Sequence, residues 1–361
     1  MLRRLQRLRR LQRVALALLP ALALASCGGG SASPVTASSS SATPSGSESR
    51  RASTSARSSS GRQSSTESHA STSVASAGSG SGDAGRSGAD AGASGDADAG
   101  STSLPGWTLV WSDEFSGAEG SDVDPTKWVH EVSGNGNGNQ ELEYYTAGIA
   151  NAFQGGGYLH IVADRVSADA GAGYTCWYGP CQYTSGKLVT QPDGQPSLFQ
   201  QQYGRFAARM KIPSGQGMWP AFWMLGANIS TVSWPTCGEI DVMENIGADP
   251  ATDYGTLHGP SSSGADVALG GSTQLATGAL SDDFHEYAVE WQADQVVFLL
   301  DDVPYFTGTE AAYTGQWVFQ QPFYLLLNLA IGGSWPGSPS ASTAFPAELL
   351  VDWVRVYSPV P

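Results

Sequence analysis

Three carboxylates stand close together in the segment CGEIDVMENIG: Glu239, Asp241 and Glu244. On a regular β-strand every second side chain shares one face, so Glu244 would lie opposite Glu239 and Asp241, about 16 Å from Glu239 along the strand. A β-bulge, one extra residue between Asp241 and Glu244, would return Glu244 to their face and shorten that separation to about 13 Å. Two carboxyl groups flanking a glycosidic bond are the usual means of hydrolysing it. The spacing therefore predicts a bulged strand that presents all three acids to one cleft.

The competing interpretation of this segment is a solvent-exposed edge strand with scattered charges. Ile240, Val242 and Met243, which lie between the acids, are too apolar for a solvated strand. Like charges crowded on one strand also raise the pKa of at least one carboxyl group, which keeps an acid protonated near neutral pH. The pattern favours catalytic carboxylates.

The strands that must position these acids are expected within residues 105–361. Alternating, β-branched and aromatic stretches recur there between Gly, Pro, Asn and Asp clusters, and no stretch of a dozen residues has a helical apolar stripe. This part holds all 11 Trp, 13 Tyr and 11 Phe of the chain, enough for one large core. The sequence has no visible internal repeat, which argues against a propeller. We predict an all-β sandwich or barrel whose polar and aromatic face suits a sugar polymer, because flat rings stack on pyranoses while amides and acids bind hydroxyls.

The first 104 residues predict two segments outside that domain. Residues 1–27 have arginines, then a short apolar run, then Leu24-Ala25-Ser26-Cys27, which is typical of a secretory signal with a lipobox-like end. Lipidation of Cys27 is favoured, with an ordinary small-residue cleavage site as the alternative. Residues 28–104 are rich in Ser, Gly and Ala and predict a disordered tether spanning about 50 Å. We expect an exported protein, held at the cell envelope by a lipid anchor or released outside the cell.

The charge of residues 105–361 limits the class of partner that they can bind. Residues 105–361 hold 27 Asp/Glu and 7 Lys/Arg, and this excess of negative charge argues against nucleic acid as a partner and is compatible with a neutral substrate.

Cys176 and Cys181 flank a Gly-Pro turn and are expected to form a disulfide after export, with free thiols as the alternative. Cys237 is then a lone thiol, and nothing supplies the four ligands of a zinc site.

The ordered motifs resemble glycoside hydrolase family 16, in particular its bacterial laminarinase-like β-1,3-glucanases. The resemblance covers residues 107–358 and includes the segments WSDEF, YTSGKLVT, YGRFAARMKIP, GMWPAFWMLG, WPTCGEIDVMEN, LNLAIGGSWPG and VDWVRVY. It implies a β-jelly-roll sandwich of two curved antiparallel sheets with a concave cleft. It also implies that Glu239 is the nucleophile and Glu244 the acid/base, and that Asp241 holds the nucleophile and modulates its charge.

The resemblance implies further cleft residues by position. His258 is expected near the acid/base, with a structural role as the alternative, and Trp335 at the border of the cleft. Trp219 and Trp223 are expected to contact sugar, although Trp-rich stretches also build cores. Two polar contacts to the sugar that the nucleophile attacks are implied at Asn139 and Arg209.

Two departures from the family pattern are visible. Asn137 stands where the family usually has a tryptophan, which removes one stacking platform, and Ala208 replaces the usual glutamate before Arg209. Many relatives bind a structural calcium, and Glu114 and Asp352 stand where ligands would be, but two oxygens are few for a site that takes six to eight. Calcium is left open, and no cofactor is required for the chemistry.

Together these features predict a monomeric retaining endo-β-1,3-glucanase that acts on a polysaccharide. One alternative is a relative that hydrolyses mixed-linkage β-glucan or a galactan; so few cations make a sulfated galactan the weaker choice. The other is a surface glucan-binding protein without turnover, which the three retained acids disfavour.

Overall fold

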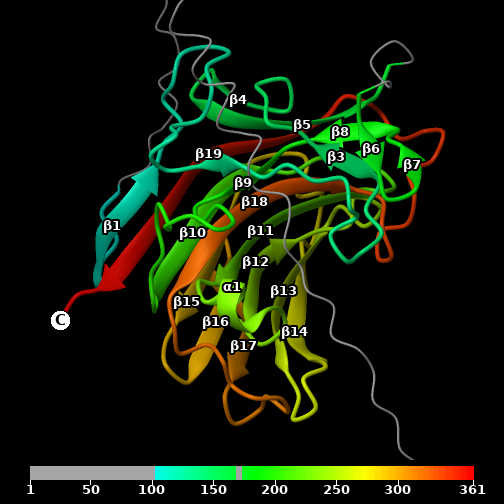
Figure 1. Ribbon diagram of the computed structural model, residues 1–361. Coiled ribbons are helices and arrows are strands. Elements are labelled where there is room, and N and C mark those ends of the chain that lie inside the picture. The colour runs from blue at the N-terminus through cyan, green and yellow to red at the C-terminus, as the bar shows by residue number, and fades with distance from the viewer. Residues whose placement is uncertain (1–101, 168–172) are drawn as a thin grey trace, which may run out of the picture. The chain divides into compact units, whose positions relative to one another are not determined.

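The computed structural model describes residues 102–167 and 173–361, which form two β-sheets packed face to face (Figure 1). The proposed signal segment, the lipidation site at Cys27 and nearly all of the proposed tether lie outside the described residues. The described part has a single short helix, α1 (Ile229–Val232). Within these ranges no helix has the length and apolar character needed to cross a bilayer.

The larger sheet has ten strands. In spatial order its main path is β17 (Val303–Thr309), β16 (Gln295–Leu300), β15 (His285–Trp291), β10 (Gly204–Lys211), β19 (Ala347–Pro359), β5 (Tyr158–Arg165), β8 (Tyr183–Ser185) and β3 (Glu143–Tyr145). Two more strands join this path, β1 (Trp107–Asp113) beside β19 and β4 (Ala152–Gly155) beside β5. Neighbouring strands are antiparallel except β3 and β8, whose parallel pairing departs from the expected antiparallel sheet.

The smaller sheet has seven antiparallel strands and curves visibly in Figure 1. Its order is β14 (Asp266–Gln274), β13 (Thr252–Pro260), β12 (Glu239–Glu244), β11 (Met218–Gly226), β18 (Phe323–Ile331), β9 (Lys187–Val189) and β2 (Val129–His130). A separate two-stranded ribbon, β6 (Thr175–Cys176) and β7 (Gly179–Pro180), is closed by the expected disulfide between Cys176 and Cys181. Cys237 is a free, buried thiol.

The core lies between the two sheets, as period-two alternation requires. One face of β10 contributes Phe206 and Ala208, while one face of β18 contributes Leu325 and Leu327, all fully buried in one cluster. The opposite face of the seven-stranded sheet is left free for other side chains. The predicted all-β sandwich of two sheets is confirmed.

Candidate active site

Strand β12 carries the irregularity that the spacing of its acids predicts. In its ladder with β11, the residues on either side of Val242 pair with successive residues of the neighbour, so Val242 has no partner there. Val242 and Met243 are both fully buried in the core between the sheets. Because two successive residues face the core, Glu244 returns to the face of Glu239 and Asp241.

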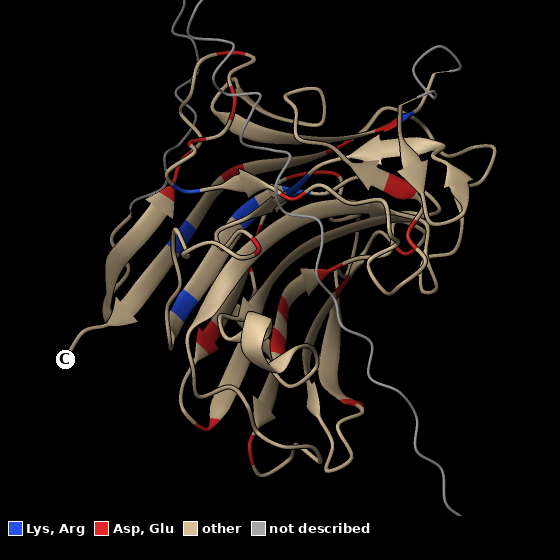
Figure 2. Ribbon diagram, viewed as in Figure 1, with Lys and Arg blue, Asp and Glu red and all other residues tan. Residues whose placement is uncertain are grey.

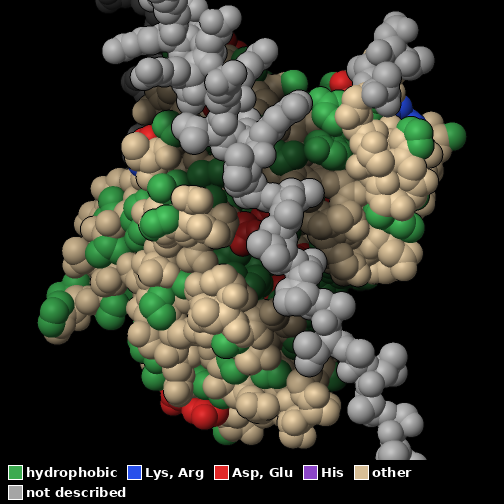
Figure 3. Space-filling view, in the orientation of Figure 1, with side chains coloured by type: hydrophobic (Ala, Val, Ile, Leu, Met, Phe, Trp, Pro, Cys, Tyr) green, Lys and Arg blue, Asp and Glu red, His purple; other side chains and the backbone are tan. Residues whose placement is uncertain are grey.

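The three acids line one cleft on the free face of the seven-stranded sheet. Acidic positions are visible on strands of this sheet in Figure 2, and acidic side chains lie in a hollow of the molecular surface in Figure 3. The other polar and aromatic lining residues are Asn137, Asn139, Glu141, Tyr145, Lys187, Trp219, Trp223 and Asn328. The cleft is therefore both acidic and aromatic, which suits a neutral sugar chain.

Each glutamate is oriented by an indole. Trp219 Nε1 donates to Glu244 Oε1 at 2.9 Å, and Trp234 Nε1 donates to Glu239 Oε2 at 3.0 Å. Trp219 stands where the sequence predicts a cleft residue. Trp234 was not predicted, although it lies only five residues before Glu239. One oxygen of each carboxylate is fixed, which leaves the other available for chemistry.

Burial and mutual repulsion separate the protonation states of the acids. Burial, followed by the charge of Glu239, raises the pKa of Glu244 to about 7. Burial and then the charges of Glu239 and Glu244 raise the pKa of Asp241 well above its usual range, so this buried carboxyl keeps its proton. Burial also raises the pKa of Glu239, but the charge of His258 opposes that shift. The site can thus hold a proton at Glu244 near neutral pH, while the charge of His258 favours the ionised form of Glu239.

His258 lies beside the acids, but its contacts are with residues other than Glu244, the acid/base near which it was expected. Its Nε2 is 3.5 Å from Asp241 Oδ2, and its Nδ1 is 3.0 Å from Asp266 Oδ2. In the β12–β13 ladder it pairs with Glu239. His258 therefore belongs to the nucleophile end of the motif rather than to the acid/base.

Donor atoms of Glu239, Asp241 and His258 all lie within 4.8 Å of one another, the one group of three among the described residues close enough to hold a metal ion. Glu239 and Asp241 are two of the three acids of the motif, and His258 is their neighbour. The arrangement of the catalytic cleft therefore explains why these three side chains lie together.

A hydrogen-bonded chain that the sequence did not predict continues along the floor of the cleft. Trp223 Nε1 donates to Asn328 Oδ1 at 2.7 Å, Asn328 Nδ2 donates to Tyr145 Oη at 3.1 Å, and Tyr145 Oη donates to Glu141 Oε2 at 3.2 Å. The signal in the sequence was Asn328 itself, a single polar residue within the apolar strand FYLLLNLAI. The chain fixes the indole of Trp223, a predicted cleft residue, in one orientation.

Lys187 is another cleft residue that the sequence did not predict. Its Nζ lies 5.1 Å from the ring centre of Trp223 and forms an ion pair with Glu131 at 2.8 Å. Residues 105–361 contain only seven Lys and Arg residues, and this scarcity is the feature of the sequence that could have drawn attention to Lys187. Its position places a positive charge in an otherwise acidic cleft.

The predicted residues Asn139 and Trp335 lie at the cleft. Asn139 lines it, and its backbone carbonyl accepts a hydrogen bond from Ser334 N at 2.8 Å. Trp335 is 40% exposed and packs edge-on against Trp219, with ring centres 5.5 Å apart. Trp335 therefore borders the cleft through Trp219.

The expected sugar contact at Arg209 is wrong. Arg209 lies on β10 of the other sheet and follows Ala208, which is fully buried in the core, so its side chain points to the outer face. There Arg209 Nη1 donates to Asp352 at 2.6 Å, and its guanidinium lies 4.7 Å from the ring centre of Phe284. These contacts, rather than the missing glutamate at 208, support this arginine.

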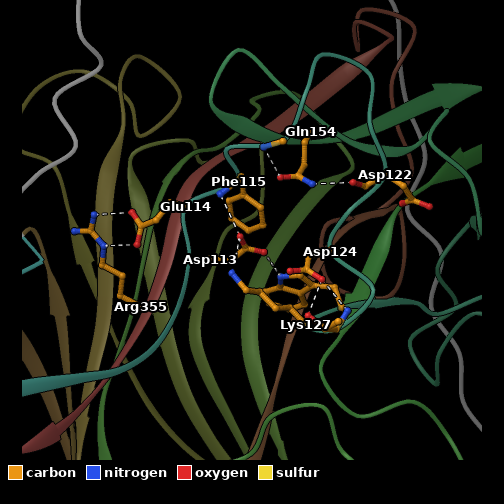
Figure 4. Close-up of polar contacts among 11 residues, drawn as sticks. Asp113, Glu114, Phe115, Asp122, Asp124, Lys127, Gln154 and Arg355 are labelled. Carbon is orange, nitrogen blue, oxygen red and sulfur yellow. Dashed lines mark hydrogen bonds and ion pairs between the residues drawn. The ribbon is translucent and has the colours of Figure 1, made fainter.

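The two carboxylates considered as calcium ligands are each paired with an arginine. Asp352 accepts from Arg209, and both oxygens of Glu114 accept from Arg355, at 3.1 and 2.7 Å (Figure 4). The sequence did not indicate these partners. Calcium binding by Glu114 and Asp352 would first require both ion pairs to break, so the structure does not favour them as a ligand set.

Comparisons with known proteins show the family of the chain. Residues 183–355 match the model of "Glycosyl hydrolases family 16". The chain is 42% identical over 271 residues to a beta-glucanase of Rhodothermus marinus, which covers 71% of this chain and 87% of that protein. It is 33% identical over 274 residues to a glucan endo-1,3-beta-glucosidase of Cryptopygus antarcticus, which covers 68% of this chain and 92% of that protein.

A solved structure gives the same result. The laminarinase from Rhodothermus marinus superposes with a TM-score of 0.61 at 40% identity, covering 72% of this chain and 100% of that structure. The likeness in sequence and in the jelly-roll fold places the chain within one known group of enzymes. The chain belongs to glycoside hydrolase family 16.

Proposed function

We propose that this glycoside hydrolase is an endo-β-1,3-glucanase that acts with retention of configuration. The observation that carries the proposal is the bulge on β12, which brings Glu239, Asp241 and Glu244 to one face of an aromatic cleft. The names of the relatives, a beta-glucanase, a glucan endo-1,3-beta-glucosidase and a laminarinase, support the choice of β-1,3-glucan.

In the proposed first step, an oxygen of Glu239 attacks the anomeric carbon while Glu244 donates its proton to the glycosidic oxygen. The carbon–oxygen bond to the leaving chain breaks, and a covalent glycosyl ester forms at Glu239. In the second step Glu244, now ionised, takes a proton from water, whose oxygen attacks the anomeric carbon and releases Glu239. Protonated Asp241 limits the negative charge that gathers around the nucleophile.

Soluble laminarin is expected to be cleaved faster than cellulose, agarose or carrageenan, with short oligosaccharides appearing early because cleavage occurs within the chain. The measurement is reducing-sugar release across a panel of purified polysaccharides, with products resolved by size over time and Glu239→Ala protein as the blank. Activity on agarose or carrageenan with none on laminarin would overturn the substrate while leaving the family in place. Equal rates on mixed-linkage glucan would broaden it to β-1,3(1,4)-glucans.

We also propose that the chain is exported and anchored through Cys27, because that cysteine follows a short apolar run and precedes a Ser/Gly/Ala-rich segment. The full-length protein is expected in the membrane fraction, and Cys27→Ser is expected to release it or block its processing. Stable attachment to the membrane would need more than one acyl group on the protein, since a single acyl group binds bilayers only marginally. A mature N-terminus beyond Cys27 in wholly soluble extracellular protein would contradict the anchor.

A further inference from the structure

The tip of the disulfide-closed ribbon carries an exposed tryptophan. Residues Trp177 and Tyr178 connect β6 to β7, and the Cys176–Cys181 bond closes the ribbon at its base. Trp177 is 50% exposed, one of the most exposed large apolar side chains in the described ranges. Such exposure has a hydrophobic cost, and here it falls on a rigid turn rather than on a loose loop.

The tip is fastened to the segment that supplies cleft residues Asn137, Asn139 and Glu141. Trp177 N donates to Gly134 O at 2.8 Å, and Trp177 Nε1 donates to Glu141 O at 2.7 Å. Tyr178 Oη donates to Leu142 O at 2.6 Å. The indole is therefore held by its edge, with half of its surface left to solvent.

The indole lies directly against the loop that carries cleft residues. A Cβ atom at Gly136 would lie 2.7 Å from Cδ1 of Trp177, so the glycine makes room for the ring. The next residue, Asn137, lines the cleft and donates through Nδ2 to Glu141 Oε2 at 2.8 Å. Trp177 thus lies beside the part of the cleft lined by Asn137 and Glu141, and is not itself among the residues that line the cleft.

We propose that Trp177 is a sugar-stacking platform that extends the substrate cleft beyond Asn137. A flat, pre-oriented indole offers a face for the apolar side of a pyranose at little entropic cost. The proposal rests on the proposed polysaccharide substrate, because only a chain longer than the part held at the acids can reach this ring. Its effect is on binding of long chains, and Trp177 takes no part in bond cleavage.

Two substitutions separate stacking from support of the cleft wall. Trp177→Phe keeps an aromatic face and loses the Nε1 bond to Glu141, whereas Trp177→Gln loses the face and keeps an N–H donor. We expect Trp177→Gln to lower kcat/KM for laminarihexaose about three- to tenfold through KM, with laminaritriose unchanged. We expect Trp177→Phe to stay close to wild type on both. Trp317→Gln is the matched control, because Trp317 Nε1 also donates to a backbone carbonyl, Ala293 O, and does not line the cleft.

Equal losses on both oligosaccharides, or a larger loss in Trp177→Phe than in Trp177→Gln, would overturn the platform and leave Trp177 as a support for Glu141. If the wild type does not cleave laminari-oligosaccharides, the proposed substrate fails, and the same ratio is measured with long and short oligosaccharides of the polysaccharide it does cleave. Retardation in native gels containing that polysaccharide reports binding without turnover. Unchanged retardation of Trp177→Gln would also contradict the platform.

Discussion

Replacing Glu239 with alanine is expected to abolish hydrolysis, with a loss on the order of 10⁴-fold or more in kcat. Without this carboxylate no glycosyl ester can form at position 239, and burial, which the substitution leaves in place as the largest cause of the raised pKa of Asp241, disfavours Asp241 as a substitute nucleophile. Initial rates on laminarin measure the loss. Glu310→Ala is the matched control, because Glu310 is an exposed carboxylate outside the cleft.

Added azide tests whether the lost group is the nucleophile. The small anion can enter the space that Glu239 vacates and attack the anomeric carbon from that face, which yields an α-glycosyl azide with an activated substrate. Product configuration is determined by NMR. A β-glycosyl azide from Glu239→Ala would assign the nucleophile to another residue, and full activity without azide would remove β12 from the chemistry.

Replacing Glu244 with alanine is expected to affect natural and activated substrates very differently. Loss of the general acid should lower kcat on laminarin by about 10²–10⁴-fold. Cleavage of an aryl glycoside with a good leaving group should still form the ester at Glu239, because that leaving group needs little protonation. Azide should then accelerate turnover and give a β-glycosyl azide, whereas an α-azide here would reverse the two roles.

The pH profile provides the control for the Glu244 substitution. The acid must be protonated, and its pKa is raised to about 7, so wild-type activity on laminarin should be present below that pH and fall about tenfold per unit above it. Removing Glu244 should remove this alkaline limb from ester formation with the aryl substrate. Persistence of the same limb in Glu244→Ala would assign that titration to another group.

The sequence predicted the features that follow from local periodicity. The bulge could be inferred because Glu239 and Asp241 follow the two-residue alternation of a strand, whereas Glu244 is one residue out of step, and the residues between the acids are apolar. The disulfide between Cys176 and Cys181 was expected from their short spacing around a turn. Both are local rules that need no knowledge of which strands become neighbours.

Features that depend on sheet assignment were harder to predict. Arg209 alternates with buried residues as a cleft residue would, but its strand β10 lies in the ten-stranded sheet and turns Arg209 to the outer face, and alternation alone does not show to which sheet a strand belongs. The sequence did show that Asn137 stands where the family usually has a tryptophan. Nothing in the sequence showed that the indole of Trp177 packs against the adjacent Gly136.

The bulge lies almost at the end of its strand, since Glu244 is the last residue of β12. In the middle of a strand, gaining or losing one residue would turn every later side chain to the wrong face of the sheet. Here only Glu244 lies beyond the bulge within the strand, and the following Asn245 anchors the next turn through bonds to Asp249 O and Thr252 O. A one-residue insertion or deletion at this point would move one acid and leave the rest of the core in register. Evolution could therefore adjust the distance between two catalytic groups here by changing the length of the chain, independently of which side chains it carries.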